Sequence, residues 1–320
     1  MKQENKLQGI RLIATGRALP ARVVTNDELS RTVDTSDEWI RTRTGIRQRY
    51  ICGSESCQSL AVKAAQNAVS KAGIKTDEIG MIVVATTTSD YAFPSMACMV
   101  QKELDMENDV MCFDINAACS GFLYGLNICR SLLMSQNKTE KKYALLIGSE
   151  QMSRLTDFTD RATCVLFGDG AGAAVLELGG GLFFHRAWSK GDAEILFCQG
   201  SGFSDAHIRM EGNKVFKFAV NVIKDGIDTI LSDAGLTIDD IDYVVCHQAN
   251  ERIIEHVRKK YGCADNKFYV NIGEYANTSA ASIPIALDEM AQNNLLKKGM
   301  KIICVGFGAG LTWSSALFEL

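Results

Sequence analysis

Residues 72–86 read Ala-Gly-Ile-Lys-Thr-Asp-Glu-Ile-Gly-Met-Ile-Val-Val-Ala-Thr, and residues 234–248 read Ala-Gly-Leu-Thr-Ile-Asp-Asp-Ile-Asp-Tyr-Val-Val-Cys-His-Gln. The two stretches share the residues Ala72, Gly73, Asp77, Ile79 and Val83. Their offset of 162 residues is close to half of the 320-residue chain. Two copies are too few for a solenoid, which needs at least three repeats. The repeat therefore indicates two related halves that pack on each other.

The same order of elements surrounds both copies. Apolar residues recur at helical spacing over 60–69 and over 216–231, and a glycine that can end a helix follows each stretch, Gly73 and Gly235. Short apolar runs then predict strands, which we place at 81–85, 243–246, 144–148 and 301–305. Because continuous apolar strands alternate with helices, we expect an α/β fold whose sheets are buried on both faces.

We expect the two halves to meet near residues 170–180, where Gly179, Gly180 and Gly181 interrupt the pattern. The predicted division is an N-terminal half over residues 1–175 and a C-terminal half over residues 176–320.

The composition excludes several classes of protein. Apolar residues make up 47% and charged residues 22%, which excludes a disordered chain. A net charge of −4 gives no support for nucleic-acid binding. No apolar run approaches the roughly 20 residues of a membrane helix, and residues 1–6 lead into no signal-like segment, so we expect a cytoplasmic protein. Eleven cysteines without a Cys-x-x-Cys pair, with only four histidines, favour reduced thiols and argue against a metal site.

One cysteine stands in a different setting from the others. Cys119 lies in Asp-Ile-Asn-Ala-Ala-Cys-Ser-Gly-Phe, residues 114–122, between a predicted strand and an apolar helix that runs to about Leu133. A thiol near a helix N-terminus has its thiolate favoured by the free amides and the macrodipole. Cys119 is therefore a candidate nucleophile, and a buried structural thiol is the alternative.

Two further polar residues, His247 and Asn277, are candidates for the site. His247 ends a predicted strand, where α/β sheets place ligands, although it could equally be a satisfied core histidine. Asn250 is expected to cap a helix that begins at Glu251. Asn277 precedes Thr-Ser-Ala-Ala-Ser, and its local sequence favours a helix cap. The glycine loops 167–172 and 305–310 lack the strand–turn–helix context of a dinucleotide site.

Four segments together resemble the beta-ketoacyl-acyl carrier protein synthase III family. They are Asp-Thr-Ser-Asp-Glu-Trp-Ile at 34–40 with Arg-Thr-Gly-Ile at 43–46, the Cys119 segment, His-Gln-Ala-Asn at 247–250, and Asn-Thr-Ser-Ala-Ala-Ser at 277–282. The resemblance runs from about residue 9 to the C-terminus. It implies the thiolase fold, with two similar α/β halves in five αβαβα layers.

The resemblance implies an acyltransferase that starts fatty-acid synthesis. Cys119 would take the primer from acyl-CoA, and His247 and Asn277 would hydrogen-bond the malonyl thioester of acyl carrier protein during decarboxylation. The carbanion would then attack acyl-Cys119. The backbone N–H groups of Cys119 and Ala309 would form the second oxyanion hole. No resident cofactor is implied. The alternative within the fold is a specialised ketosynthase or acyltransferase of secondary metabolism.

The remaining site residues also follow from the resemblance. Those implied to bind CoA or pantetheine are Trp39, Arg43, Arg161 and Asn250. Lys217 and Arg252 would form a docking face for the carrier protein, although a basic helix is also consistent with a solvated surface. Phe167 would form the floor of the acyl pocket. Phe93 would reach into a partner subunit, which implies a homodimer.

The sequence departs from the family pattern at Ala309 and Ser314, where glycine is usual. A backbone donor at Ala309 survives unless its φ is positive. Residues 181–209 match the family least well and could alter the accepted primer.

Overall fold

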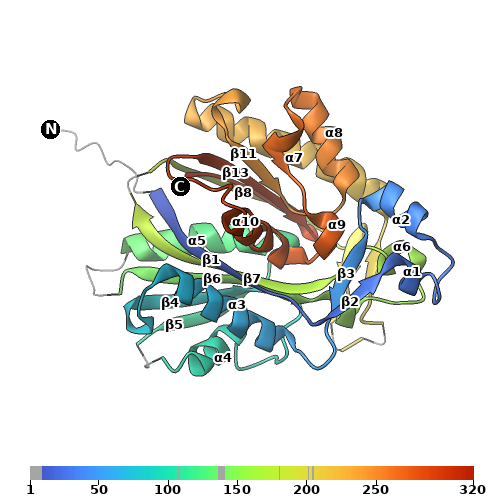
Figure 1. The fold of residues 1–320 in the computed structure, drawn as a ribbon, viewed down its shortest axis with the longest axis horizontal. Coiled ribbons are helices and arrows are strands. Elements are labelled where there is room, and N and C mark those ends of the chain that lie inside the picture. Colours follow the sequence, from blue (N-terminus) through green and yellow to red (C-terminus); the bar gives the residue numbers. More distant parts are fainter. Residues whose placement is uncertain (1–8, 107–108, 136–140, 180, 201, 204) are drawn as a thin grey trace.

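Each half of the chain forms one five-stranded sheet, and both sheets have the same strand order (Figure 1). A computed structural model describes residues 9–106, 109–135, 141–179, 181–200, 202–203 and 205–320. The first sheet, in spatial order, contains β5 (Met111–Ile115), β4 (Ile79–Ala85), β6 (Tyr143–Gln151), β7 (Asp169–Gly179) and β1 (Gly9–Ala18). The second contains β12 (Phe268–Tyr269), β11 (Tyr243–Cys246), β13 (Lys301–Gly308), β14 (Gly310–Glu319) and β8 (Phe183–Asp192).

The direction of the strands repeats as well. In each sheet the first three strands are parallel, and the last two run antiparallel to their neighbours. The internal repeat in the sequence therefore corresponds to a duplicated sheet, in which β4 is the counterpart of β11.

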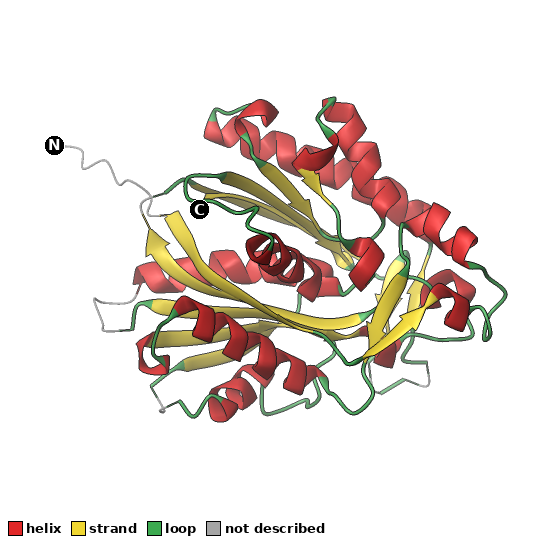
Figure 2. Ribbon diagram, in the orientation of Figure 1, coloured by secondary structure: helices red, strands yellow, loops and turns green. Residues whose placement is uncertain are grey.

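Helices form three layers around and between the sheets (Figure 2). The outer face of the first sheet is covered by α3 (Cys57–Ala72) and α4 (Met96–Glu103), and that of the second by α7 (Gly212–Ala234) and α8 (Glu251–Tyr261). Between the sheets lie α5 (Gly121–Ser135) and α10 (Ser282–Gln292). This arrangement is the five-layer αβαβα fold expected from the resemblance.

The predicted elements form for the reasons that the sequence suggested. α3 buries alanines at helical spacing and ends at Gly73, whose φ is 64°. α7 ends in the same way at Gly235, with φ 66°. β4 is buried along its whole length, because α4 and α5 cover its two faces. The four predicted strands all occur, with β6 and β13 longer at their carboxyl ends than expected.

The central layer joins the two halves into one core. Phe122 and Leu123 of α5 pack in the same apolar cluster as Ile283 and Leu287 of α10. In the sequence, β7 ends in the first sheet at Gly179 and β8 begins in the second at Phe183, while Gly180 lies outside the described residues. The division at 175 and 176 stays a prediction.

Smaller elements complete the described chain. They are β2 (Arg22–Thr25), α1 (Asn26–Leu29), α2 (Asp37–Thr44), β3 (Gln48–Ile51), α6 (Arg161–Cys164), β9 (Leu196–Cys198), β10 (Ile208–Met210) and α9 (Ile272–Tyr275). Within the described part of the chain, none of the helices has the length and apolar character needed to cross a membrane. All eleven cysteines are free thiols.

Candidate active site

Cys119 lies where the first sheet meets the central helix layer. Strand β5 leads into a 3₁₀ turn, Ala118–Ser120, which continues directly into α5. The turn begins with a positive φ of 45° at Ala118, which an alanine rarely adopts. Cys119 itself is half-buried. The predicted position at a helix N-terminus is confirmed.

The second half of the chain contains an equivalent turn. Ser279–Ala281 forms a 3₁₀ turn that continues into α10, and its first residue, Ser279, has a φ of 50°. The thiol of Cys119 donates a hydrogen bond to Ser279 Oγ at 3.3 Å. The two halves are thus in contact at the candidate nucleophile.

His247 follows β11 and is fixed from three sides. Its backbone N–H donates to Val305 O at 2.7 Å, Nδ1 lies 2.7 Å from Ser282 Oγ, and the ring packs edge-on against Phe307 with centroids 5.3 Å apart. Burial lowers the pKa of the His247 imidazole to about 3, so the ring is neutral near pH 7. Ser282 Oγ also accepts from Gln248 N–H at 3.3 Å, so its own proton is available to Nδ1.

Asn277 is held beside the candidate acyl pocket. Its N–H donates to Leu166 O at 2.9 Å, and its carbonyl accepts from Gly168 N–H at 3.0 Å, so it pairs with the strand-like segment of Phe167. Its side-chain Oδ1 accepts from Ser279 N–H at 2.9 Å. The side chain therefore closes an Asx turn with Ser279, whereas Thr278 and Ala281 stand at the cap positions, so the helix cap suggested by the local sequence does not form. The Nδ2 group of Asn277 is the donor that this arrangement leaves over.

The protonation state of Cys119 differs from the expectation. Burial raises the pKa of the Cys119 thiol to about 12, the Ser279 hydrogen bond lowers it, and the Glu150 carboxyl raises it. With its pKa raised by burial, the resting group is a thiol. A proton acceptor is needed when the sulfur attacks a carbonyl.

The C-terminal glycine loop lies against the Cys119 turn. A Cβ added to Gly308 would lie 2.7 Å from Cys119 N, and one added to Gly306 would lie 3.3 Å from Ser120 Cα. Ala309 follows at once and is not among the described residues with positive φ, so its backbone donor keeps an ordinary geometry. The glycines at 306 and 308 permit this close approach.

Ser314, the other departure from the family pattern, has a structural explanation. Its Oγ lies 2.9 Å from His185 Nε2 and donates to Arg186 O at 2.9 Å. Both contacts lie between β14 and β8. The serine side chain therefore adds hydrogen bonds toward β8, while its backbone pairs with Gly306 of the C-terminal glycine loop.

The residues expected to bind CoA gather at the surface near α2. Trp39 stacks with two guanidinium groups, those of Arg43 at 4.5 Å and Arg161 at 4.9 Å from its ring centroid. Asn250 caps α8 by accepting from Arg252 N–H at 2.9 Å and donates through Nδ2 to Arg43 O at 3.1 Å. The predicted cap is confirmed.

The predicted docking residues lie on neighbouring helices of the outer layer. Lys217 on α7 and Arg252 on α8 are both exposed. The Arg252 guanidinium lies 6.0 Å from the Phe216 ring centroid. Further along α8, Arg258 pairs with Glu255 and Asp265, so the charge of Arg258 is neutralised.

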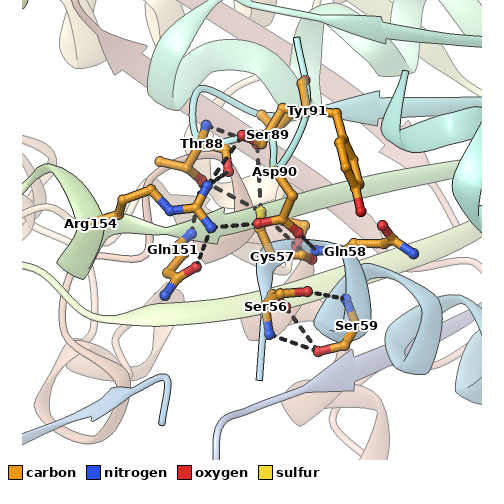
Figure 3. A network of polar contacts seen from close by, with 12 residues as sticks. Ser56, Cys57, Gln58, Ser59, Thr88, Ser89, Asp90, Tyr91, Gln151 and Arg154 are labelled. Carbon is orange, nitrogen blue, oxygen red and sulfur yellow. Dashed lines mark hydrogen bonds and ion pairs between the residues drawn. The ribbon is translucent and has the colours of Figure 1, made fainter. Parts of the chain in front are cut away.

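The loop after β4 presents Phe93 to solvent, with 86% of the residue exposed. Figure 3 shows how the base of this loop is held. Arg154 donates to the carbonyls of Thr88 and Ser89 at 3.2 Å and pairs with Asp90, which in turn accepts from Gln58 N–H at 2.7 Å.

Phe167 is buried between the segment of Asn277 and the hairpin of β9 and β10. It packs with Met152 and with Ile208 of β10. The hairpin belongs to the stretch that matches the family least well, and residues 201 and 204 of that stretch lie outside the described residues.

Three site residues were missed by the sequence reasoning. Glu150, at the end of β6, accepts from Ser279 Oγ at 3.0 Å, Thr87 N–H at 3.1 Å and Thr88 Oγ1 at 2.7 Å. Ser279 and Ser282 lie in the quoted 277–282 segment, where only Asn277 was singled out. In the described part of the chain, no three His, Cys, Asp or Glu side chains are grouped so that they could hold a metal ion.

Comparisons with known proteins agree along the whole chain. Sequence models of 3-oxoacyl-[acyl-carrier-protein (ACP)] synthase III match residues 113–188, and those of its C-terminal part match residues 231–320. The beta-ketoacyl-[acyl-carrier-protein] synthase III of Clostridium acetobutylicum is 44% identical over 98% of this chain and 99% of its own length.

Solved structures show the same fold. The 3-oxoacyl-[acyl-carrier-protein] synthase III of Aquifex aeolicus superposes with a TM-score of 0.92 at 41% identity, covering 98% of this chain and 100% of that one. The priming beta-ketosynthase of the R1128 polyketide pathway gives 0.89 at 31% identity, covering 98% of this chain and 96% of that one.

Proposed function

Because the chain belongs to the beta-ketoacyl-[acyl-carrier-protein] synthase III family, we propose that Cys119, His247 and Asn277 carry out its condensation reaction. The enzyme is an acyltransferase and performs the initiating condensation of fatty-acid synthesis. Identity is higher to the Clostridium acetobutylicum enzyme, at 44%, than to the polyketide priming enzyme, at 31%, which favours fatty-acid synthesis over a specialised pathway.

The first half-reaction acylates Cys119. The thiol sulfur attacks the carbonyl of an acyl-CoA primer, and the carbonyl oxygen becomes an oxyanion. We place that oxygen between the backbone N–H groups of Cys119 and Ala309, because Gly308 brings the C-terminal loop to the nucleophile turn. Each such donor is worth roughly 3 kcal/mol of transition-state stabilisation.

The second half-reaction decarboxylates the malonyl group on acyl carrier protein. Negative charge develops on the thioester oxygen as carbon dioxide leaves. The neutral His247 ring, with Nδ1 facing Ser282, carries its proton on Nε2 and donates from there to that oxygen. Asn277 donates from Nδ2, since its Oδ1 is occupied by Ser279 N–H. The carbanion then attacks acyl-Cys119 and releases the 3-ketoacyl product.

The observation that carries this proposal is the convergence of the three side chains on one pair of turns. Cys119 contacts Ser279, Asn277 bonds the same serine, and His247 bonds Ser282 three residues further on. This convergence of residues from both halves of the chain supports a shared site at Cys119.

The residues at the surface fit the expected substrates and partners. Trp39 with Arg43 and Arg161 offers an aromatic face and two cations to the adenine and phosphates of CoA. Lys217 and Arg252 face an acidic carrier protein. Exposed Phe93 supports a homodimer, which sedimentation of a Phe93→Asp variant as a monomer would support and sedimentation as the parent assembly would contradict. The proposed enzyme uses no resident cofactor and is located in the cytoplasm.

Separating the half-reactions tests the triad. Cys119→Ala should form no acyl-enzyme and no ketoacyl product, yet still release carbon dioxide from the malonyl thioester, because both enolate donors remain. Asn277→Ala should acylate but decarboxylate about 100-fold more slowly. Labelled carbon dioxide release and intact mass measure the two steps. Normal decarboxylation by Asn277→Ala would leave Asn277 with only the structural role of its hydrogen bond to Ser279.

A further inference from the structure

We propose that Ser279 and Glu150 form a proton relay that takes the thiol proton of Cys119 during acylation and returns it when the product leaves. The inference rests on the proposed role of Cys119 as nucleophile. Two hydrogen bonds make the path: Cys119 Sγ donates to Ser279 Oγ at 3.3 Å, and Ser279 Oγ donates to Glu150 Oε1 at 3.0 Å.

Cys119 needs such a path. Its thiol is protonated at rest, because burial raises its pKa to about 12. Among the described residues, the hydrogen bond of its side chain is to Ser279, and the Nδ1 atom of His247 is engaged by Ser282. A hydroxyl group that accepts from the thiol while donating to a carboxylate transfers a proton without itself changing charge.

Glu150 is built as the terminal acceptor. The residue is 0% exposed, and the groups around its carboxyl are donors: the Thr87 N–H and the hydroxyls of Thr87, Thr88 and Ser279. These donors favour a carboxylate, whereas burial raises the pKa of the Glu150 carboxyl above its usual value. Burial is the larger effect, and a raised pKa makes this carboxyl a stronger proton acceptor than an ordinary glutamate.

Among the residues that the structure describes, the titratable groups coupled to Glu150 are two thiols. Cys119 approaches from the central layer through Ser279, and Cys57 approaches from the start of α3, where its Sγ lies 3.5 Å from Thr88 Oγ1. Burial raises the pKa of Cys57 to about 12, so both thiols are neutral at rest. In the described part of the chain, Glu150 forms no ion pair with a basic side chain.

The backbone at Ser279 supports a functional role. Its φ of 50° is a conformation that costs a serine energy, and such strain persists where the surroundings fix it. This φ belongs to the turn in which the Ser279 N–H bonds Asn277 while its hydroxyl bonds Cys119 and Glu150. Ser279 touches the reacting sulfur and is a catalytic residue, whereas Glu150 acts through it and is a positioning residue.

Each proton that leaves Cys119 during acylation returns to it at the end of the reaction cycle. During acylation the S–H bond of Cys119 breaks, its proton passes to Ser279 Oγ as the serine proton passes to Glu150, and the sulfur lone pair forms the bond to the acyl carbon. The C–S bond to CoA breaks, and the CoA thiolate takes a proton from solvent. After condensation the Cys119 thiolate is released and regains its proton from Glu150 through Ser279.

Two variants test the relay, and a third serves as a control. Glu150→Gln and Ser279→Ala should slow acylation of Cys119 by acyl-CoA at neutral pH at least tenfold, with a rate that rises toward high pH as hydroxide replaces the acceptor. Asp169→Asn is the matched control. Asp169 is also 0% exposed and held by neutral donors, Cys52 N–H and Ser153, but has no contact with Cys119. Its pH profile should follow the parent.

A second measurement separates the relay from general damage to the fold. In a Cys119→Ala background, adding Glu150→Gln should leave carbon dioxide release from malonyl thioester within about twofold, since decarboxylation moves no proton through the relay. Equal losses in both half-reactions would overturn the proposal, as would acylation rates equal to the parent at all pH values. Acylation that persists in Cys119→Ala would instead overturn the proposed nucleophile.

Discussion

Ser282 illustrates how one buried hydroxyl sets the chemistry of a neighbouring ring. Its Oγ lies 2.7 Å from His247 Nδ1 and accepts from Gln248 N–H. Ser282→Ala should slow decarboxylation of the malonyl thioester about tenfold, because a buried polar atom loses its partner at a cost of about 1–2 kcal/mol and the ring loses its fixed tautomer.

Acylation of Cys119 is the internal control for this variant. Intact mass after incubation with acyl-CoA should match the parent, while labelled carbon dioxide release falls. If both half-reactions keep their parent rates, the His247 tautomer does not depend on Ser282.

At the residue scale, the sequence predicts the position of a site residue when the residues next to it in the chain determine that position. Cys119, His247 and Asn277 each follow a strand or precede a helix, and the local pattern shows it. Glu150 also lies at the end of an apolar strand, where a carboxylate in the sequence could have indicated a site residue. Its partner Ser279 is 129 residues away, and the contact exists only because two turns from different halves meet. The raised pKa of Cys119 likewise follows from burial in three dimensions.

Among the elements, α8 presents its first turn for recognition. Arg252 is exposed and lies next to the cap Asn250 in the first turn of the helix. Arg252→Glu should slow condensation with carrier-bound malonyl groups by reversing a charge on the docking face, and should leave self-acylation unchanged. The defect should lessen at high salt, where surface charges are screened.

Lys259 offers a matched control on the same helix. It is exposed in the last turn of α8, away from Asn250. Lys259→Glu should change condensation little. Equal losses in Lys259→Glu and Arg252→Glu would indicate an effect of total charge instead of a local docking surface.

The hairpin of β9 and β10 is the element expected to tune the primer. Ile208 packs on Phe167, and both are at most 6% exposed. Ile208→Ala removes three carbons beside the proposed pocket floor, so longer or branched acyl-CoA primers should gain relative to short ones. Competition between mixed acyl-CoAs, with the acyl-enzyme identified by mass, measures the shift.

Ile230→Ala controls for the loss of a buried isoleucine. Ile230 is 0% exposed on α7 and packs in the outer cluster of the second sheet. Both variants should lose a few kcal/mol of stability, but Ile230→Ala should keep the parent's primer preference. An unchanged preference in Ile208→Ala would place the pocket elsewhere.

For the whole molecule, buried histidines predict sensitivity to acid. Burial lowers the pKa of His185 to about 4 and that of His247 to about 3. In the unfolded chain histidine titrates near pH 6.5, so below that pH the unfolded state binds protons that the folded state does not. The free energy of unfolding therefore falls as the pH drops from about 6.5, by up to about 1.4 kcal/mol per unit and histidine.

Replacing His185 isolates the contribution of this one histidine to the pH dependence of the free energy of unfolding. His185→Gln cannot gain a charge and can still donate to Ser314. Between about pH 6.5 and pH 5 it should lose about 2 kcal/mol less stability than the parent, measured by urea unfolding. Parallel pH profiles for parent and variant would show that His185 titrates normally in the folded protein.

More of the fold than of the candidate site could be predicted from the sequence. Repeated apolar runs and helix-ending glycines follow from local rules, and they gave the duplicated sheets. The hydrogen-bond partners that cross between sheets depend on packing of the central layer, where α5 and α10 meet, and no local rule specifies them.

The paired turns at Ala118–Ser120 and Ser279–Ala281 also carry a record of ancestry. An ancestor with one copy of this unit, associated with itself, would have placed two identical turns face to face. In the present chain the second position is Cys119 in one turn and Ala280 in the other, and the first is Ala118 in one and Ser279 in the other. Each turn therefore has a group that the other lacks, and the matched pair of turns forms a single asymmetric site. A change in either turn is constrained by a residue 160 positions away.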